Sequence, residues 1–176
     1  FHLTENPFKK HEVDHTNKFN LRSSNVTGLS VYDNDKIFVT VSRGGLGLYN
    51  TKTEEFEELP FYMSDTDRLR VTSVFVDSSR NIWIKLLGNG NLYRVRGGRN
   101  DFKIVDFKGG TPIAGGNIRN IEEDKQGNLY FGTESELFKI KLDENQDISS
   151  VERLSDNPFF KGQDISLLRC VYVDPL

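Results

Sequence analysis

The three histidines are the residues best suited to catalysis or metal binding, and they crowd into one end of the chain. His2, His11 and His15 lie in the first fifteen residues, and no histidine follows. The spacing of His11 and His15 would suit a metal site on a helix, but the segment reads as strand and loop and supplies no third ligand in a usual pattern. We therefore expect no metal, no cofactor and solvated surface histidines.

Three aspartates recur at one position of an internal pattern and resemble paired catalytic carboxylates at first sight. Asp77, Asp124 and Asp174 each end an apolar, strand-like segment and precede a turn. An aspartate in that place accepts backbone N–H hydrogen bonds and fixes the turn, so we predict a structural role for all three. A Ser–His–Asp arrangement stays open because its members can lie far apart in sequence, but nothing favours it.

Two other chemical candidates are also interpreted as structural. The glycine-rich pieces Arg43–Gly45 and Gly115–Gly116 do not open helices, so no phosphate-binding loop is expected. The single cysteine, Cys170, forbids an internal disulfide, and we interpret it as a small buried apolar residue.

Charge and composition exclude several classes of function. With 23 basic and 26 acidic residues, the net charge of −3 offers no basic field for nucleic acid or an anionic membrane. No stretch approaches the ~18 apolar residues of a membrane span, and the first residues lack the apolar run of a signal peptide. Because the chain begins at Phe1 and its only methionine is Met63, we expect an excised piece of a longer protein.

An internal repeat is the strongest signal in the sequence. Val26–Val39, Val71–Ile84 and Ile118–Phe131 align without gaps, and Leu168–Asp174 begins a fourth copy. The successive starts lie 45, 47 and 50 residues apart. Every complete copy has an aromatic residue at the same place, which is Phe38, Trp83 or Tyr130.

Each repeat resolves into four short strand-like pieces separated by turns rich in glycine and asparagine, which tolerate the positive φ of tight hairpins. No segment carries a long helical apolar stripe, so we expect almost no helix. The predicted strands are Thr27–Val31, Ile37–Val41, Leu46–Tyr49, Phe56–Leu59, Val71–Val76, Ile82–Leu86, Leu92–Val95, Phe102–Phe107, Arg119–Glu123, Leu129–Gly132, Leu137–Leu142 and Val151–Leu154.

Four antiparallel strands in a repeat of this length predict an all-β fold, a β-propeller fragment with about three complete blades and partial blades at both ends. A β-sandwich would not repeat its sequence, and a β-helix has a much shorter period. The repeated aromatic is expected to fill the gap between neighbouring blades. We assign residues 1–176 to part of one propeller domain, with a blade remnant at 1–15, blades at about 26–60, 71–107 and 118–154, and the start of another at 168–176. Since propellers close with about four to eight blades, we expect the isolated arc to aggregate or to pair with its missing portion.

The residues of the repeat match a more specific pattern than that of propellers in general. Ile118–Thr133 resembles the two-component-regulator propeller repeat, with Asp124, Gly127, Asn128 and a closing Gly132 in its pattern. The second unit departs from that pattern, with Arg80 at the turn glycine and Lys85–Leu86 in place of Gly–Thr. The third unit has Glu136–Leu137 where Gly–Leu is expected.

The resemblance implies a function in signalling. Proteins with this repeat are often periplasmic sensor regions of hybrid two-component systems in gut Bacteroidetes, with a membrane span, a histidine kinase and an output module downstream. The resemblance implies that this chain belongs to a non-catalytic periplasmic ectodomain that senses oligosaccharides derived from glycans. The chain would be attached to the membrane only through the parent protein. The parent would be a histidine kinase and a homodimer, and the partners of this chain would be the ligand and the remaining blades.

The ligand is expected at the loops that join one blade to the next and second strands to third strands. Aromatic, arginine, asparagine and acidic side chains in these loops suit sugars, whose ring faces stack while their hydroxyls need donors and acceptors. The candidate ligand-binding residues are Arg43, Tyr62, Asp67, Arg70, Asn89, Asn91, Asn117 and Glu134.

Two other functions remain open. One is a propeller enzyme of the streptogramin-lyase type, which a catalytic histidine on a blade loop would support; the absence of histidine after His15 counts against it within this chain. The other is a propeller that docks a protein.

Overall fold

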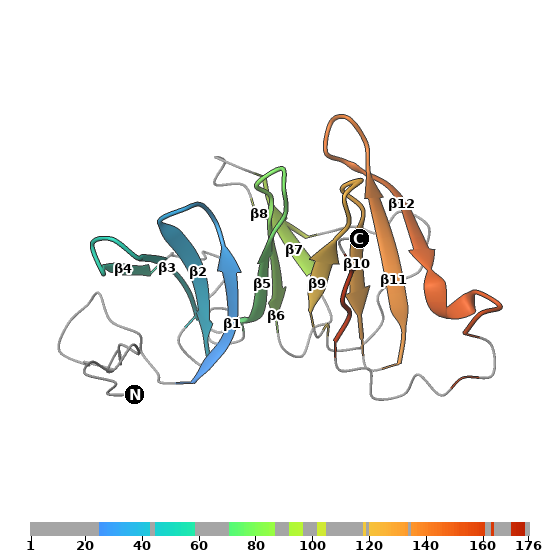
Figure 1. Ribbon diagram of the computed structural model, residues 1–176, viewed down its shortest axis with the longest axis horizontal. Helices are drawn as coiled ribbons and strands as arrows, with labels where there is room; N and C mark the ends of the chain where they lie inside the picture. Colours follow the sequence, from blue (N-terminus) through green and yellow to red (C-terminus); the bar gives the residue numbers. More distant parts are fainter. Residues whose placement is uncertain are drawn as a thin grey trace, which may run out of the picture.

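The structure, a computed structural model, describes residues 25–42, 45–58, 71–86, 92–96, 102–104, 118, 120–133, 135–160, 163 and 170–174. Within them, twelve strands form three separate four-stranded antiparallel sheets, each in simple chain order. The sheets stand next to one another along the molecule (Figure 1). They confirm the predicted β-propeller blades, and the one helical element of the described residues is the short 3₁₀ turn η1 (Leu154–Asp156).

The strands follow the repeat closely. Blade 1 contains β1 (Val26–Val31), β2 (Lys36–Val41), β3 (Gly45–Asn50) and β4 (Phe56–Glu58). Blade 2 contains β5 (Val71–Val76), β6 (Ile82–Leu86), β7 (Leu92–Val95) and β8 (Phe102–Ile104). Blade 3 contains β9 (Ile121–Glu123), β10 (Leu129–Gly132), β11 (Leu137–Leu142) and β12 (Ile148–Arg153).

The largest departure from the predicted strands is at β12, which begins at Ile148 rather than Val151. The preceding turn closes tightly, because the Asp143 N–H donates to the Asp147 carbonyl at 2.8 Å, and pairing resumes at Leu142 and Ile148. Leu154, predicted as the last strand residue, instead begins η1. β9 begins at Ile121 rather than Arg119, and the end predicted for β8 lies outside the described residues.

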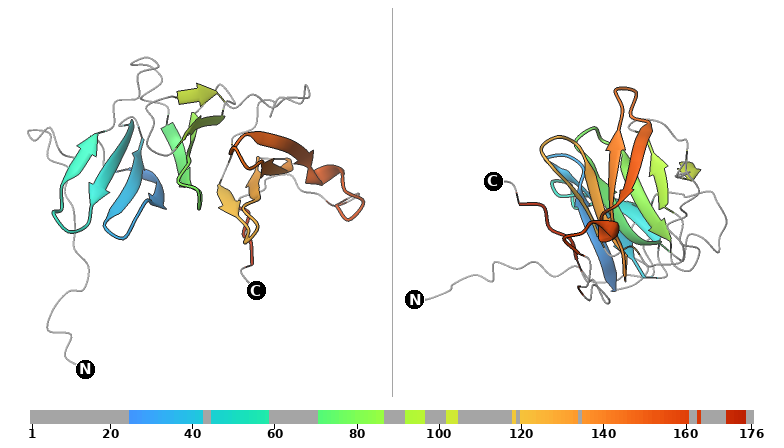
Figure 2. Two further views of the ribbon diagram at one scale, coloured as in Figure 1. Left: turned by 90° about the horizontal axis from the view of Figure 1, so that it is seen from above. Right: turned by 90° about the vertical axis from the view of Figure 1, so that its right-hand side faces the viewer.

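Two apolar clusters join the blades. One contains Phe38 of blade 1 with Val74 and Ile84 of blade 2, and the other contains Trp83 of blade 2 with Phe131 of blade 3. The alternation of side chains along a strand explains this, since each sheet sends successive residues to opposite neighbours. Figure 2, seen from above, shows the three sheets side by side in the order of the chain.

The repeated aromatic behaves differently in the third blade. Phe38 and Trp83 are buried against the next blade, as predicted. Tyr130 is only partly buried, because it lies on the face of blade 3 away from blade 2, where no further complete sheet stands in the described part of the chain. Cys170 is exposed, which corrects the expectation of a buried thiol, and residues 170–174 around it form no strand.

The face of β1 that points away from blade 2 is apolar and exposed. Leu29 and Val31 are 65% and 67% exposed, whereas Val74 and Ile121, which occupy the place of Leu29 in the other repeats, are each 5% exposed. The difference arises because Val74 packs on blade 1 and Ile121 packs on blade 2. The blade remnant predicted at 1–15 lies outside the described residues.

Candidate functional site: the polar junction of the second and third blades

The repeated aspartates close the hairpin between the first and second strands of their blades. In blade 2 the Asp77 carboxylate accepts from the Asn81 backbone and side chain, both at 2.8 Å, and from Trp83 Nε1 at 2.8 Å. Asp77 and Asn81 are 4% and 2% exposed. The three donors leave this buried carboxylate fully engaged in the fold, which confirms the structural role predicted for Asp77.

Blade 3 repeats the arrangement with a tyrosine in place of tryptophan. Asp124 accepts from the Asn128 backbone at 2.8 Å, from its side-chain amide at 2.7 Å and from the Tyr130 hydroxyl at 3.0 Å. Burial alone would raise the pKa of the Asp124 carboxyl, but the hydrogen bonds from Asn128 and Tyr130 outweigh it and hold that pKa below its usual value. Asp124 therefore stays ionised and structural, as predicted. The described residues settle no such role for Asp174.

These turns need one residue in the left-handed region just before their last position. Gly127 fills that position with φ 77° in blade 3, as expected for glycine. Arg80 occupies it in blade 2, and Gln146 occupies the corresponding place of the β11–β12 turn (Asp143–Asp147), with φ 62° each. Both long side chains reach the preceding blade: the Arg80 guanidinium lies 5.5 Å from the centre of the Tyr32 ring, and Gln146 Oε1 accepts from Asn81 Nδ2 at 3.2 Å.

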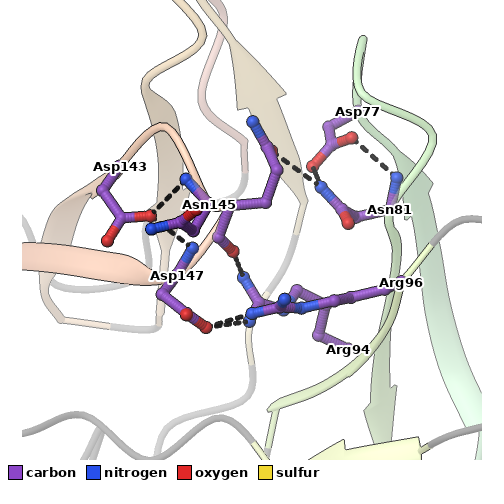
Figure 3. Close-up of polar contacts among 8 residues, drawn as sticks. Asp77, Asn81, Arg94, Arg96, Asp143, Asn145 and Asp147 are labelled. Atoms are coloured by element: carbon purple, nitrogen blue, oxygen red, sulfur yellow. Dashed lines mark hydrogen bonds and ion pairs between the residues drawn. The ribbon is translucent and has the colours of Figure 1, made fainter.

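A set of polar contacts then fastens the β11–β12 turn to blade 2 (Figure 3). Arg94 donates to the Gln146 carbonyl and lies 3.5 Å from the Asp147 carboxylate, and Arg96 also donates to Asp147. The Arg94 guanidinium is 5.4 Å from the centre of the Trp83 ring. Burial, and then the positive charge of Arg96, lower the pKa of Arg94, and Asp147 opposes that shift.

Glu123 makes a second polar link between the same blades. Its two carboxylate oxygens accept from the Ser78 backbone N–H and from the Ser78 hydroxyl, both at 2.7 Å. Between these links lies a cavity of about 440 Å³, formed at the ends of three turns. It is lined by Ser78, Ser79, Glu123, Lys125, Gln126, Gly127, Leu142, Asp143, Glu144 and Gln146.

The cavity is lined mainly by polar side chains that can donate and accept hydrogen bonds. Its lining mixes donors such as Lys125 and Ser79 with acceptors such as Asp143 and Glu144, a combination that matches the hydroxyl groups of a sugar. Within the described part of the chain, no three histidine, cysteine or acidic side chains could together hold a metal ion. The same residues contain no helix long and apolar enough to cross a membrane.

The eight ligand-binding residues predicted from the sequence all lie outside the residues that the structure describes, and so do the three histidines. The structure therefore leaves that part of the prediction untested. The cavity forms at the opposite ends of the strands, at turns such as Asp77–Asn81 and Asp124–Asn128, which the sequence marked only as structural. What the sequence lacked was a sign that side chains at Gln146 and Glu123 meet the neighbouring blade.

One unusual residue lies at the other end of β6. Lys85 is 1% exposed, its amino group has no hydrogen-bond partner among the residues that the structure describes, and burial lowers its pKa to about 8. The sequence did carry a signal here, because Lys85–Leu86 departs from the Gly–Thr of the repeat.

Comparisons with known proteins also indicate a propeller fold for this chain. Residues 112–135 match the family model described as two component regulator propeller. No curated protein matches the chain significantly. Among solved structures, the extracellular domain of a proposed hybrid two-component system from B. thetaiotaomicron is similar over 84% of this chain and 19% of its own length, with 19% identity and a TM-score of 0.58.

Two further structures share the fold. A second extracellular domain from B. thetaiotaomicron, of another proposed hybrid two-component system, has 15% identity, a TM-score of 0.51 and coverage of 72% of this chain and 19% of its own. Virginiamycin B lyase from Staphylococcus aureus has 16% identity, a TM-score of 0.52 and coverage of 71% and 40%. The chain thus spans less than half of each of these proteins.

Proposed function

We propose that this chain is a ligand-binding segment of a propeller sensor in a two-component system and that it is not itself catalytic. The observation that carries the proposal is the match of residues 112–135 to the two component regulator propeller model. That match covers the start of blade 3, whose register recurs in blades 1 and 2. The proposed parent protein is a membrane-bound histidine kinase with the propeller on its periplasmic side.

The proposed ligands are oligosaccharides released from glycans. Support comes from the polar cavity between blades 2 and 3, where donors and acceptors converge without an apolar floor beyond Leu142. A ligand held there would contact both blades, because Ser78 and Ser79 belong to blade 2 and Gln126 and Glu144 belong to blade 3. Binding would then stiffen the junction, and such a change in rigidity can couple the site to another part of the protein.

A lyase is the second candidate, favoured by the similarity to virginiamycin B lyase. One similar structure is a catalytically inactive histidine-to-alanine variant of that enzyme. The present chain has no histidine beyond His15, so it offers no histidine within the three blades for such a role. This favours sensing over catalysis for these residues.

A glycan panel tests the proposal. The full-length protein is screened by thermal shift with neutral and acidic oligosaccharides, and each hit is then measured by isothermal titration calorimetry. We expect at least one saccharide to raise the melting temperature and to be recovered unchanged by mass spectrometry. Conversion of a bound saccharide into product would favour the lyase. Stabilisation by a protein partner alone, with no saccharide effect, would favour protein docking.

A further inference from the structure

Two arginines at the end of β7 bind the turn that joins β11 to β12. Arg94 donates to the Gln146 carbonyl and lies 3.5 Å from the Asp147 carboxylate. Arg96 donates to the same carboxylate (Figure 3). Arg94 is also paired with Trp83 across the β6–β7 ladder, so both side chains project from the face of blade 2 that blade 3 covers. Two cations and one acidic turn therefore help to close this junction.

Blade 3 carries the same arrangement on its opposite face, with lysines in place of the arginines. Lys139 is paired with Tyr130 across the β10–β11 ladder, and its Nζ lies 5.1 Å from the centre of that ring. Arg94 and Trp83 are the equivalent pair in blade 2. Lys141 lies two residues after Lys139, in the place of the second arginine, and so projects from the same face. The face of blade 3 that points away from blade 2 thus has the basic residues and the aromatic ring of the covered face of blade 2.

The two lysines lack the acidic partner that the arginines have. Glu152 lies opposite Lys139 on β12, and Glu122 lies opposite Tyr130 on the same face. Within the described residues, neither carboxylate forms an ion pair with either lysine. Tyr130 is only partly buried, whereas its tryptophan counterpart is 0% exposed. In the described part of the chain, this face therefore lacks the cover that its charges and its ring would fit.

The acidic end of the turn also recurs. In the β11–β12 turn, Gln146 has φ 62° and is followed by Asp147. In the β3–β4 turn of blade 1, Glu54 has φ 61° and is followed by Glu55. Both turns between third and fourth strands that the structure describes therefore end in a left-handed residue and a carboxylate. A following blade of the same repeat is expected to offer an acidic turn of this kind.

The basic pair is not a requirement of the blade itself. Blade 1 has Leu48 and Asn50 at the corresponding places of β3. Leu48 packs against the apolar cluster that blades 1 and 2 share. The cations thus occur at particular junctions, and the junction that the structure shows with such a pair has an acidic turn as its partner.

The start of a further repeat lies beside blade 3. The Asn120 side chain donates to the Val171 carbonyl at 2.6 Å and accepts from the Val171 N–H at 2.7 Å. The first strands of blades 1 and 2 have a comparable link, in which the Ser30 hydroxyl accepts from the Val76 N–H at 2.8 Å. Val171 therefore lies where the first strand of a following blade would pass. A second copy of this chain could not bring its β1 to that place without displacing Val171.

We propose that the face of blade 3 formed by Tyr130, Lys139 and Lys141 is the docking surface for one further blade of the parent protein, the blade that residues 168–174 begin. The turn between the third and fourth strands of that blade presents a carboxylate to the two lysines. Charge-assisted hydrogen bonds join them, as they join Asp147 to the arginines. This contact concerns the assembly of the propeller, so it goes beyond ligand sensing and does not depend on the proposed ligand.

The first experiment is cross-linking of the full-length protein with a carbodiimide, which joins a lysine directly to a carboxylate that it contacts. Peptides are mapped by mass spectrometry, and an equal mixture of unlabelled and ¹⁵N-labelled protein separates contacts within a molecule from contacts between molecules. We expect Lys139 or Lys141 to be joined, within one molecule, to an acidic residue in the turn between the third and fourth strands of the following blade. Lys52 and Asp35, 2.8 Å apart in blade 1, are the control for the reaction.

Three results of this experiment would overturn the inference. A link between labelled and unlabelled chains would make a second copy the occupant. Links only to Glu122 or Glu152 would show that blade 3 satisfies its own lysines. The absence of any link from either lysine, with the link between Lys52 and Asp35 present, would show that no carboxylate covers this face.

The second experiment tests the charges by exchanging them. The double variant Lys139→Glu/Lys141→Glu brings like charges together and should speed hydrogen exchange in β10 and β11 of the full-length protein at least about tenfold. Replacement of the cross-linked acidic residue by lysine should then restore much of the slow exchange. A neutral Lys139→Met/Lys141→Met variant, which keeps an apolar stem over the Tyr130 ring, should have a smaller effect.

The matched control makes the same exchange at the junction of blades 2 and 3. Arg94→Glu/Arg96→Glu should speed hydrogen exchange in β7 and β12, and the addition of Asp147→Lys should slow it again. If the control pair is restored but the lysine pair is not, the acidic turn is not the partner and the inference is overturned. Unchanged exchange in Lys139→Glu/Lys141→Glu would overturn it as well.

Discussion

At the scale of single residues, the carboxylates of Asp77 and Asp124 hold the first hairpin of their blades through hydrogen bonds from an asparagine and an aromatic side chain. Their place before a turn was enough to predict that Asp77 and Asp124 act in structure and not in catalysis. The aromatic partners were not foreseen, because Trp83 and Tyr130 lie six residues further along and were expected only to fill the gap between blades. Their polar atoms donate to the same carboxylates. A residue pattern indicates strand and turn, but not which polar tip finds which acceptor.

The Asp124 carboxylate offers a prediction on pH dependence. Asp124→Asn should lower the free energy of unfolding by about 1–3 kcal/mol at pH 7, because an amide cannot accept all of its present donors. The pKa of Asp124 is lowered in the folded state, so its contribution is complete above the unfolded value and is lost as the pH falls through the folded one. Urea unfolding at pH 7 and pH 3 should show the difference between variant and wild type shrinking.

Asp143→Asn is the matched control for this prediction. Among the described residues, the Asp143 carboxylate accepts only from the backbone N–H groups of Asn145 and Asp147, each at 2.9 Å, and the residue is exposed. Its substitution should cost less at pH 7. Equal losses for the two aspartates would contradict the importance assigned to Asn128 and Tyr130.

Lys85 leads to a prediction of the opposite sign. Its pKa is about 8 in the folded protein, against 10.5 as the ordinary value, so the unfolded chain binds more protons between these pH values. Stability should therefore rise from pH 8 to pH 10.5, by up to about 3 kcal/mol at 1.36 kcal/mol per pKa unit. Lys85→Met should be more stable than wild type at pH 7 and lack this rise. Chemical unfolding of both proteins across this pH range measures the free energy of unfolding. Parallel dependence on pH in the two proteins would contradict the lowered pKa of Lys85.

At the scale of elements, strands were the part of the fold that the sequence predicted best. β5, β6, β7, β10 and β11 have the predicted bounds, because their apolar residues are bracketed by turn residues. β12 was predicted too short, since its exposed serines gave no apolar signal for pairing. The cavity was not predicted, because it depends on the approach of two blades and not on any one repeat.

The left-handed turn residues can be tested as a set. Gln146→Ala keeps the unfavourable φ and loses the bond to Asn81, so it should reduce stability by about 1 kcal/mol. Gln146→Gly loses the same bond but relieves the backbone, and should come close to wild type. Thermal unfolding of the two variants, compared with wild type, gives the difference.

Gly127→Ala measures the backbone cost of the left-handed position in the β9–β10 turn, which has the same hydrogen-bonded form as the β11–β12 turn. Its φ is 77°, and an added Cβ would meet only Glu123 Oε1, at 3.7 Å. The substitution should therefore cost about 1 kcal/mol through the backbone alone. If Gly127→Ala is neutral while Gln146→Gly is destabilising, the left-handed turn does not limit these blades.

At the scale of the whole molecule, the uncovered face of β1 is the most consequential feature. Val74 and Ile121 show that this position is buried wherever a preceding blade is present. Leu29→Asp in the full-length protein should therefore reduce stability by about 2–3 kcal/mol, if another blade covers β1 there. In the isolated chain the same variant should keep its melting temperature and aggregate less. Light scattering measures the aggregation and thermal unfolding measures the stability. An unchanged stability of the full-length variant would argue against a blade that covers β1.

The contacts between repeats have a consequence for how the proposed sensor would respond to a ligand. Ser30 accepts from Val76, Glu123 accepts from Ser78, and Asn120 exchanges two hydrogen bonds with Val171, so each of these links spans about one repeat, with separations of 46, 45 and 51 residues. Units coupled in this way behave as a linear array with nearest-neighbour interactions. A disturbance at one junction then decays along the array, and does not act through a long lever. In the proposed sensor, a junction that binds ligand and the site that responds to it should therefore lie in neighbouring blades.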